Sequence, residues 1–362
     1  MALRLARLAD FATRTRDARK VLVVDLGFLG DTLHTVPALW ELRRYYPHAG
    51  LHMLAAPVGA EVLALAPCVD RAWAFPLSQP SPPPWKHWGI LRALRRERFE
   101  VALNFSGADR PLFINALTRA PWRVAHDAGR PHAWRRWLIP NWIPRQSRGL
   151  PIFEQRRQVL AQLGFPLGPA RFDLALPPAA RDWAEANVPA GALHVSINAS
   201  SPVKEWPLAH WAALARQLLR DQPGRCLVAT GSPSPREQAR LGEFADAVDD
   251  PRLRVFRAPL AIAQLAALLA RCACHLGADS GVLHLAVAVG IPTFSIFRDY
   301  EGLPEWCPSG PVHAAIVEPC PCEAARVWTA ACHRQAQCLT RVAPEVVAIR
   351  LREHLRSAGT GL

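Results

Sequence analysis

Short apolar runs alternate along this chain with segments in which apolar residues recur at helical spacing. Runs of β-branched and aliphatic residues, such as 20–26 and 51–56, predict buried strands. Between them, 31–46 places Leu33 and Val36 on one face and predicts a helix. The first half continues with expected strands at 71–75, 99–105 and 123–125 and expected helices at 58–66, 88–98, 111–119 and 154–163. Such repeated strand–helix units predict an α/β fold with a mostly parallel sheet.

A second series of strand–helix units follows a proline-rich stretch at 164–178, which predicts a linker. Its expected strands are 193–197, 226–230, 253–256, 274–276 and 293–297, and its expected helices are 207–220, one that contains Glu237, 262–271, 282–289 and 345–356. We therefore expect an N-terminal domain at 1–170, a second domain at 171–340 and a closing helix at 341–362. The carboxyl edges of both sheets are expected to line one cleft.

The most informative stretch is the turn at 277–281, which joins a strand to a helix. A helix that opens directly after a strand points unpaired N–H groups at the edge of the sheet, where anions bind. The sequence thus predicts a phosphate site of a nucleotide ligand around Ser280 and Gly281. Asp279 adds an acceptor there and His284 a donor, although Asp279 could instead serve as a helix N-cap.

The first strand of the chain is followed by the glycine-containing loop 27–31, which has the spacing G-x-x-G-D. A dinucleotide fold has G-x-G-x-x-G here and an acidic residue at the end of the second strand, which 51–56 lacks. A nicotinamide-dependent oxidoreductase is therefore disfavoured, and no cofactor is expected.

The chain of 362 residues has a net charge of +13, which predicts an anionic partner: nucleic acid, an anionic membrane surface or an acidic substrate. No apolar run is long enough to span a bilayer, and 1–19 has no signal-peptide core, so a cytoplasmic location is expected. The arginines of 1–19 predict either a solvated leader helix or a segment that touches a membrane.

Residues 127–150 interleave tryptophans with arginines and show no regular pattern. They are interpreted either as a surface loop or as a loop that binds an anionic acceptor through Arg135 and Arg136. Similar runs bind single-stranded nucleic acid, but no nucleic-acid-binding motif accompanies this one.

Four cysteines lie close together near the C-terminus, at Cys320, Cys322, Cys332 and Cys338. Their number allows a small metal site, but the C-x-C spacing is tight and C-x₂-C is absent. No metal is expected, and buried free thiols or a structural role are favoured.

Three motifs stand in order along the chain: LGDTLHTVPAL at 29–39, KEWPLAHWAALA at 204–215 and GADSGVLHLAVAVGIPT at 277–293. Together they resemble glycosyltransferase family 9, the heptosyltransferases of lipopolysaccharide core synthesis. The resemblance covers about 20–350 and implies a GT-B fold, in which two Rossmann-like domains face a cleft and a C-terminal helix returns to the N-terminal domain. It also implies transfer from ADP-L-glycero-D-manno-heptose, with inversion, to an anionic inner-core lipopolysaccharide acceptor, at the inner face of the inner membrane of a Gram-negative bacterium.

The same resemblance implies roles for individual residues. Asp31 would be the general base, with an N-cap as the alternative, and Lys204 would neutralise the leaving diphosphate, with an exposed surface lysine as the alternative. Gly30 would contact the acceptor. The implied donor-binding residues are Ser200, Ser201, Lys204, Glu237, Asp279, Ser280, Gly281 and His284.

The chain departs from the family pattern before its Gly-Asp pair, where Asp25 to Phe28 replace a basic residue and two serines. Phe28 removes a hydroxyl, which leaves the choice of acceptor open, and Asp25 is interpreted as structural. The chain also lacks an Asp-x-Asp pair, which fits a lysine and a helix terminus in place of a metal ion. The open alternatives are the same fold with another nucleotide-sugar donor, or with a protein (autotransporter) acceptor, and a basic nucleic-acid-binding protein.

Overall fold

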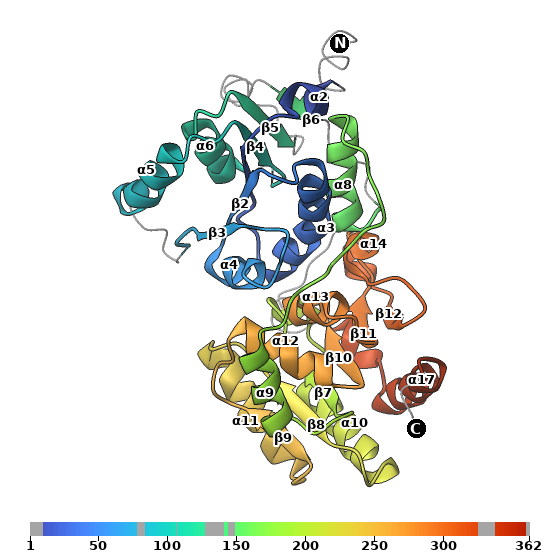
Figure 1. Cartoon of the computed structure of the whole chain (residues 1–362). Coiled ribbons are helices and arrows are strands. Elements are labelled where there is room, and N and C mark those ends of the chain that lie inside the picture. The colour runs from blue at the N-terminus through green and yellow to red at the C-terminus, as the bar shows by residue number, and fades with distance from the viewer. Residues whose placement is uncertain are drawn as a thin grey trace. The chain divides into compact units, whose positions relative to one another are not determined.

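The computed structural model describes residues 10–77, 84–106, 108–126, 141–143, 149–324 and 337–359. The chain divides into two compact units, 1–175 and 176–362, and each unit is built around its own parallel sheet (Figure 1). The boundary follows Ala175, close to the end of the proline-rich stretch.

The sheet of the first unit has the order β3-β2-β1-β4-β5-β6, with every described pair parallel. Its strands are β1 (Lys20–Val24), β2 (Gly50–Ala55), β3 (Arg71–Ala74), β4 (Val101–Asn104), β5 (Trp122–His126) and β6 (Asn141–Ile143). The chain proceeds in one direction from β1 to β3 and then crosses to the other side of β1 at β4. The carboxyl ends of β1 and β4 therefore form a topological switch point, where such sheets bind ligands.

Helices cover both faces of this sheet. They are α2 (Phe11–Thr15), α3 (Leu29–Tyr45), α4 (Pro57–Leu63), α5 (Trp88–Arg96), α6 (Asp109–Leu117) and α8 (Ile152–Gln162), with a 3₁₀ turn at Pro84–His87. Side chains of α2, α3 and α8 pack with Val21 and Val23 on one face, and side chains of α5 and α6 pack with Leu22 and Val24 on the other. This alternation along β1 shows why a strand buried on both faces reads as one continuous apolar run.

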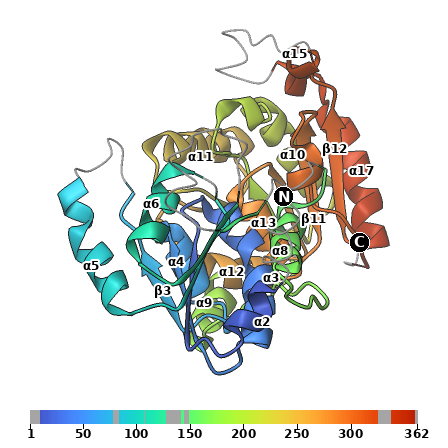
Figure 2. The ribbon, with the colours of Figure 1, turned by 90° about the horizontal axis from the view of Figure 1, so that it is seen from above.

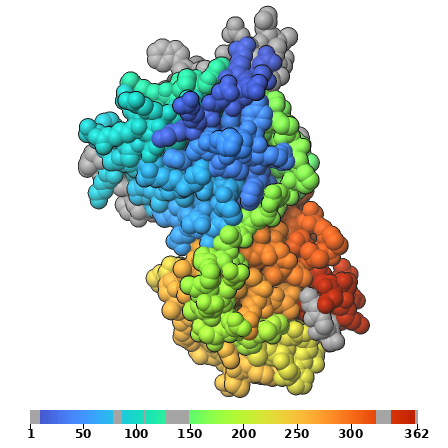
Figure 3. All heavy atoms as spheres, in the orientation of Figure 1, coloured from blue at the N-terminus to red at the C-terminus, as the bar shows by residue number. Residues whose placement is uncertain are grey.

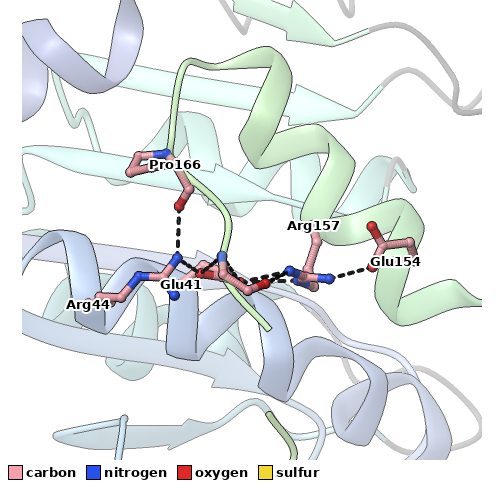
Figure 4. A network of polar contacts seen from close by, with 6 residues as sticks. Glu41, Arg44, Glu154, Arg157 and Pro166 are labelled. Carbon is pink, nitrogen blue, oxygen red and sulfur yellow. Dashed lines mark hydrogen bonds and ion pairs between the residues drawn. The ribbon is translucent and has the colours of Figure 1, made fainter. Parts of the chain in front are cut away.

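A buried ion-pair network fixes α8 and the chain that follows it to α3 (Figure 4). The carboxylate of Glu41 accepts hydrogen bonds from Arg157 Nη2 at 3.0 Å and from the backbone N–H of Gly168 at 3.2 Å. Arg44 also pairs with Glu41 and donates to the carbonyl of Pro166 at 2.9 Å. The network thus ties the start of the linker, green in Figure 3, to the first unit.

The second unit repeats the strand order of the first: read from its other edge, its sheet is β9-β8-β7-β10-β11-β12, again parallel. The strands are β7 (Leu193–Ser196), β8 (Leu227–Thr230), β9 (Leu253–Phe256), β10 (Cys274–Ala278), β11 (Thr293–Arg298) and β12 (His313–Glu318). The switch point here lies between β7 and β10. It brings the segment after Ser196 next to the segment after Ala278.

The helices of this unit are α9 (Pro178–Asn187), α10 (Leu208–Asp221), α11 (Pro235–Val248), α12 (Ile262–Arg271), α13 (Gly281–Ala288), α14 (Leu303–Trp306), α15 (Pro321–Ala324) and α17 (Pro344–Ser357), with 3₁₀ turns at Pro202–Lys204 and Cys338–Arg341. One face of the sheet presents Leu193, Val195 and Leu276 to an apolar core shared with α10, α11 and α17. The opposite face carries His194 and His275, so it is polar although it is buried.

Several elements differ from those expected. A strand, β6, lies within 127–150, where none was expected, and α9 and β12 were missed. Within the second unit α17 packs against α10 (Figure 2), and the expected return of the closing helix to the N-terminal domain stays a prediction. Phe11 of α2 is buried in the core of the first unit, so at least this part of the leader is not a solvated helix.

In the part of the chain that the structure describes, no helix combines the length and apolar character needed to cross a bilayer.

Candidate functional site

One candidate site follows β1, at the switch point of the first unit. The carboxylate of Asp25 accepts a hydrogen bond from the N–H of Gly27 at 3.0 Å, which closes a tight turn after the strand. Helix α3 then begins at Leu29, so Asp31 lies in its first turn and not in the preceding loop as expected. Asp31 Oδ2 accepts from the N–H of Phe28 at 2.9 Å, which is the role of the third helical residue in a capping box and not of an N-cap.

Arg156 of α8 reaches this turn from 125 residues further along the chain. Its Nη2 lies 2.6 Å from Asp25 Oδ2 and 3.6 Å from Asp31 Oδ1. Its Nη1 donates to the carbonyl of Asp31 and to the hydroxyl of Thr35. The Thr35 hydroxyl in turn lies 3.3 Å from Asp25 Oδ2. The guanidinium therefore joins two carboxylates and the first turn of α3.

The electrostatic surroundings raise the pKa of Asp31 above its ordinary value. Burial is the main cause, Arg156 opposes it, and the charge of Asp25 adds to it. A raised pKa makes a carboxylate a stronger base, provided that the pH is high enough to keep it ionised. The side chain of Asp31 is 28% exposed, which leaves it accessible to a substrate.

The neighbouring residues give this turn its shape. Gly30 is buried in the first turn of α3, whereas Phe28 is 79% exposed. A Cβ on Gly27 would lie 2.4 Å from Asp31 Cβ, so only glycine fits beside the carboxylate. Arg135 and Arg136, the other expected acceptor contacts, lie outside the described residues.

Another candidate site joins the two strands at the switch point of the second unit. Lys204, in the 3₁₀ turn after β7, places Nζ 2.7 Å from Asp279 Oδ2, directly after β10. Tyr300, after β11, donates its hydroxyl to the same Asp279 oxygen at 3.0 Å. Burial and the charge of Asp279 raise the pKa of Tyr300, so the phenol stays protonated and remains a donor. Asp279 is thus an ion-pair partner; the N-cap of α13 is Ser280.

Helix α13 presents its N-terminus at the same place. Ser280 Oγ is buried and has no hydrogen-bond partner among the described residues, so it can serve a ligand. The N–H groups at Gly281 and beyond begin the helix, where a phosphate is favoured. His284 is buried one turn later, and burial lowers its pKa to about 4, so the imidazole is neutral at physiological pH.

A set of polar contacts with helix α11, called the clamp here, fixes the segment 198–205, which carries Lys204. The buried carboxylate of Glu205 accepts from the N–H of Ala199 at 3.0 Å and from Arg236 at 2.7 and 2.9 Å. Arg236 also donates to the carbonyl of Ala199, and Arg240 donates to Asn198 Oδ1 at 3.0 Å. These contacts hold 198–205 against α11. Within that segment Ser200 is exposed and Ser201 is half-buried.

Glu237, the expected ribose ligand, lies in the first turn of α11. Its Oε2 accepts a hydrogen bond from the N–H of Ser232 at 2.9 Å, so it also shapes the loop after β8. It lies at the carboxyl edge of the sheet that carries Lys204 and Asp279, on the segment that follows β8.

A histidine pair lies in the polar face of the second sheet. His194 Nδ1 and His275 Nδ1 are 2.8 Å apart, and His194 Nε2 is 2.9 Å from Thr230 Oγ1. Burial lowers the pKa of His194 to about 3 and that of His275 well below its ordinary value. Both imidazoles are therefore neutral and structural rather than ligands for the donor.

The C-terminal cysteines give only a partial test of a metal site. The thiols of Cys320 and Cys338 are hydrogen-bonded, and burial with the neighbouring Cys320 raises the pKa of Cys338 to about 11. Metals bind thiolates, which such a pKa disfavours. Cys322 is half-buried, and Cys332 lies outside the described residues. Within the ranges that the structure describes, no cluster of at least three His, Cys, Asp or Glu side chains could hold a metal ion.

Five residues that the sequence predicted as donor contacts lie around one switch point of the structure. They are Lys204, Asp279, Ser280, Gly281 and His284. Sequence reasoning missed Arg156, Tyr300 and Glu205. Glu205 sits inside the KEWP motif, so its position was visible although its partners were not. Arg156 and Tyr300 carried no signal, because their contacts depend on how distant segments pack.

Comparison with known proteins identifies close counterparts of this architecture. A family model described as glycosyltransferase family 9 (heptosyltransferase) matches residues 87–317. Lipopolysaccharide heptosyltransferase 1 of Pseudomonas aeruginosa is 27% identical, and the match covers 94% of this chain and 99% of that protein.

Among solved structures, E. coli ADP-heptose lps heptosyltransferase II superposes with a TM-score of 0.70 at 18% identity, covering 94% of this chain and 99% of the other. The E. coli heptosyltransferase WaaC with ADP-2-deoxy-2-fluoro heptose also gives 0.70, covering 92% and 99%. These likenesses confirm the expected fold class, two parallel-sheet α/β domains of the GT-B type.

Proposed function

Because this chain belongs to glycosyltransferase family 9 and is therefore a glycosyltransferase, we propose that it transfers heptose from ADP-L-glycero-D-manno-heptose to the inner core of lipopolysaccharide. The near-complete match to a lipopolysaccharide heptosyltransferase supports both substrates. The shared fold with an enzyme solved with an ADP-heptose analogue supports the donor. The proposed acceptor is Kdo-lipid A or its heptosylated form, and transfer inverts the anomeric centre.

The donor half of the reaction is assigned to the second unit. Lys204 neutralises the leaving diphosphate, and the amides of Ser280 and Gly281 at the start of α13 receive its phosphate oxygens. Asp279 holds Lys204 in place until the donor arrives, since the two side chains are paired at 2.7 Å. His284, Ser200, Ser201 and Glu237 complete the proposed donor contacts. No step requires a bound metal, because the lysine and the helix terminus supply positive charge where the leaving group gains negative charge.

The acceptor half is assigned to the first unit. Asp31 accepts the proton of the attacking hydroxyl while that oxygen bonds to the anomeric carbon and ADP leaves from the opposite face. The capping contact with Phe28 fixes one carboxylate oxygen, which leaves the other, Oδ1, for the acceptor. Gly30, Arg135 and Arg136 remain proposed acceptor contacts.

The observation that carries this proposal is the convergence of Lys204, Asp279 and the start of α13 at one switch point. It is tested by calorimetric binding of ADP, UDP, GDP and NAD to the wild type and to Lys204→Ala. We expect selective binding of ADP that weakens in the variant. Arg220→Ala, at the far end of α10, is the matched control and should bind ADP like the wild type. Preference for UDP or GDP would assign a different donor to the same fold, and no nucleotide binding would contradict the donor site.

A different acceptor is the main alternative, because Asp25 to Phe28 replace the basic residue and serines expected before Gly30. Transfer from ADP-heptose to Kdo-lipid A, to its heptosylated form and to an autotransporter protein separates the possibilities. Transfer to the protein alone would keep the enzyme class and overturn the lipopolysaccharide acceptor.

We also propose that the protein works at the inner face of the inner membrane, in contact with anionic lipid. Helices α5 and α6 lie side by side in the first unit (Figures 1 and 2) and expose aromatic, aliphatic and basic side chains. The exposed residues are Trp88, Arg92, Arg95, Arg96, Arg110, Phe113 and Leu117. Arginines with exposed aromatic rings suit an anionic lipid surface.

Sedimentation with vesicles tests this contact. The wild type should bind vesicles that contain anionic lipid, and the triple variant Arg92→Ala, Arg95→Ala, Arg96→Ala should bind them less while keeping its affinity for ADP. Equal binding of neutral and anionic vesicles would contradict the proposal. A steeply salt-dependent affinity for unrelated DNA without nucleotide binding would instead favour a nucleic-acid-binding protein.

A further inference from the structure

Arg156 is a buried cation that the proposed chemistry does not use, although it lies against the proposed base. Its guanidinium makes a close ion pair with Asp25 at 2.6 Å and a longer one with Asp31 at 3.6 Å. Asp25 is 2% exposed and Arg156 is 8% exposed. Two buried charges so close to a third are costly to maintain unless they are fully paired, which makes their presence beside Asp31 notable.

The two terminal nitrogens of the Arg156 guanidinium have different partners. Nη1 donates to the carbonyl of Asp31 and to Thr35 Oγ1, and thereby anchors the first turn of α3. Nη2 is committed mainly to Asp25, which leaves Asp31 Oδ1 outside hydrogen-bond distance of the arginine. Without Asp25, the same nitrogen would be available to Asp31 and would compete with the substrate hydroxyl for that oxygen.

We propose that Arg156 and Asp25 form a positioning pair for Asp31, in which Arg156 fixes the base in place and Asp25 keeps the guanidinium from capturing its carboxylate. The inference rests on the proposed role of Asp31 and adds two residues that do not touch the reacting atoms. It explains why an acidic residue stands at the end of β1: it retains the arginine that orients the helix and leaves the base free.

Among the described residues of the first unit, the charges that act on Asp31 are those of Arg156, on α8, and Asp25, in the preceding turn. The backbone N–H of Phe28, at the helix start, also donates a hydrogen bond to Asp31. The other elements packed on α3 carry Glu61 on α4, which is exposed, and His52 on β2, which is hydrogen-bonded to Trp73. Changes at Arg156 and Asp25 should therefore shift the titration of Asp31 in opposite directions.

The test is the pH dependence of kcat/KM in the full-length protein, with the position of the acidic limb as readout. Asp25→Asn keeps the shape of the side chain but removes its charge, so Arg156 is free to pair with Asp31 and to stabilise its ionised form. The acidic limb should therefore move to lower pH by about one unit. Arg156→Gln leaves two carboxylates together and should move it to higher pH. The double variant should lie between the two, because both charges are gone.

Arg157→Gln is the matched control, since Arg157 is buried on the same helix but pairs with Glu41. Whatever stability it loses, its acidic limb should stay in place. Circular dichroism and urea unfolding check that the first unit of each variant is folded, and Asp25→Asn carries the test if Arg156→Gln does not fold. If the acidic limb of Asp25→Asn does not move while Asp31→Asn is inactive, the positioning pair is contradicted but the role of Asp31 as the base is not. Full activity of Asp31→Asn would instead overturn the base on which this inference rests.

Discussion

At the scale of single residues, Gly27 is a position where the structure leaves little room for a side chain. An added Cβ would lie 2.4 Å from Asp31 Cβ and 2.5 Å from Asp31 Cγ, so the carboxylate of Asp31 would have to move. Displacing a reacting group by about 1 Å costs roughly 10²-fold in rate. We therefore expect Gly27→Ala to lower kcat by about that factor while ADP still binds. Gly224→Ala, where nothing lies within 4 Å, should leave kcat unchanged.

Asp31 itself gives the most direct test of the acceptor half. Asp31→Asn keeps the size of the side chain but cannot take a proton, so we expect kcat to fall by about 10²–10⁴-fold, the usual contribution of a general base. Affinity for ADP should hold, because the donor contacts are proposed in the second unit. Asp109→Asn, the first-turn aspartate of α6, is the control. Turnover in Asp31→Asn equal to that of the control would remove Asp31 as the base.

The site residues that could be predicted from sequence are those that lie in continuous motifs at strand ends. Lys204 and Asp279 belong to two such motifs, and strand order alone brings the ends of β7 and β10 together. Arg156 could not be predicted, because an arginine on a helix 125 residues away has many possible partners. Which one it meets depends on how α8 packs on α3, a tertiary fact that local pattern does not contain.

At the scale of elements, the segment 198–205 depends on α11 for its shape. The buried carboxylate of Glu205, one residue after Lys204, accepts hydrogen bonds from Arg236 and from the N–H of Ala199. Glu205→Gln removes the negative charge that Arg236 and Arg240 face. We therefore expect the free energy of unfolding to fall by about 1–3 kcal/mol. ADP should also bind more weakly, since Lys204 loses its fixed backbone.

Urea unfolding and calorimetry with ADP measure the two effects of Glu205→Gln. Glu243→Gln, an exposed acid on α11, is the matched control and should change neither. Loss of stability with unchanged affinity for ADP would show that the clamp supports the fold but does not position Lys204.

The polar face of β7 and β10 makes stability depend on pH. The pKa of His194 falls from an ordinary 6.5 to about 3 on folding, and that of His275 falls as well. The unfolded chain therefore binds more protons below pH 6.5, and stability is lost as the pH falls through this range. For each imidazole that stays neutral in the folded protein, the free energy of unfolding should be lower by roughly 2 kcal/mol at pH 5 than at neutral pH.

Urea unfolding at pH 7 and pH 5 measures this loss. In His194→Asn the loss between the two pH values should be smaller, because one of the histidines with a lowered pKa is gone. His48→Asn, at the exposed turn after α3, is the control and should lose stability as the wild type does. An equal loss in His194→Asn and the wild type would place the pH dependence elsewhere.

Elements with a strong apolar pattern were predicted from the sequence, whereas an edge strand and a helix next to the linker were not. The central strand β1 is almost entirely apolar, because both of its faces are covered, and β7 and β10 are fully buried strands with apolar residues on one face. Edge strand β12, HAAIVE, is only half-buried along most of its length and lacks that signal. Helix α9 begins at Pro178 inside a proline-rich stretch, which composition alone assigns to a linker.

At the scale of the whole molecule, the same sheet order occurs twice, and each copy places its proposed half-site at the corresponding switch point. The two units nevertheless carry different chemistry. The first offers a carboxylate held by an arginine, and the second offers a lysine, a helix N-terminus and a neutral histidine. A repeated architecture thus separates the group that activates the acceptor from the groups that stabilise the leaving nucleotide.

This separation predicts that the second unit alone binds the nucleotide. Residues 176–362 contain their own core, including Leu351 and Leu355 of α17, so a fragment with these bounds should fold. Because Lys204, Asp279 and Tyr300 all lie within it, we expect its affinity for ADP to stay within about tenfold of the full chain, or about 1.4 kcal/mol. Calorimetry measures the affinity, circular dichroism checks folding, and Lys204→Ala in the fragment should weaken binding as it does in the full chain. A folded fragment that does not bind ADP would mean that the first unit supplies essential donor contacts, and the assignment of one substrate to each unit would then be wrong.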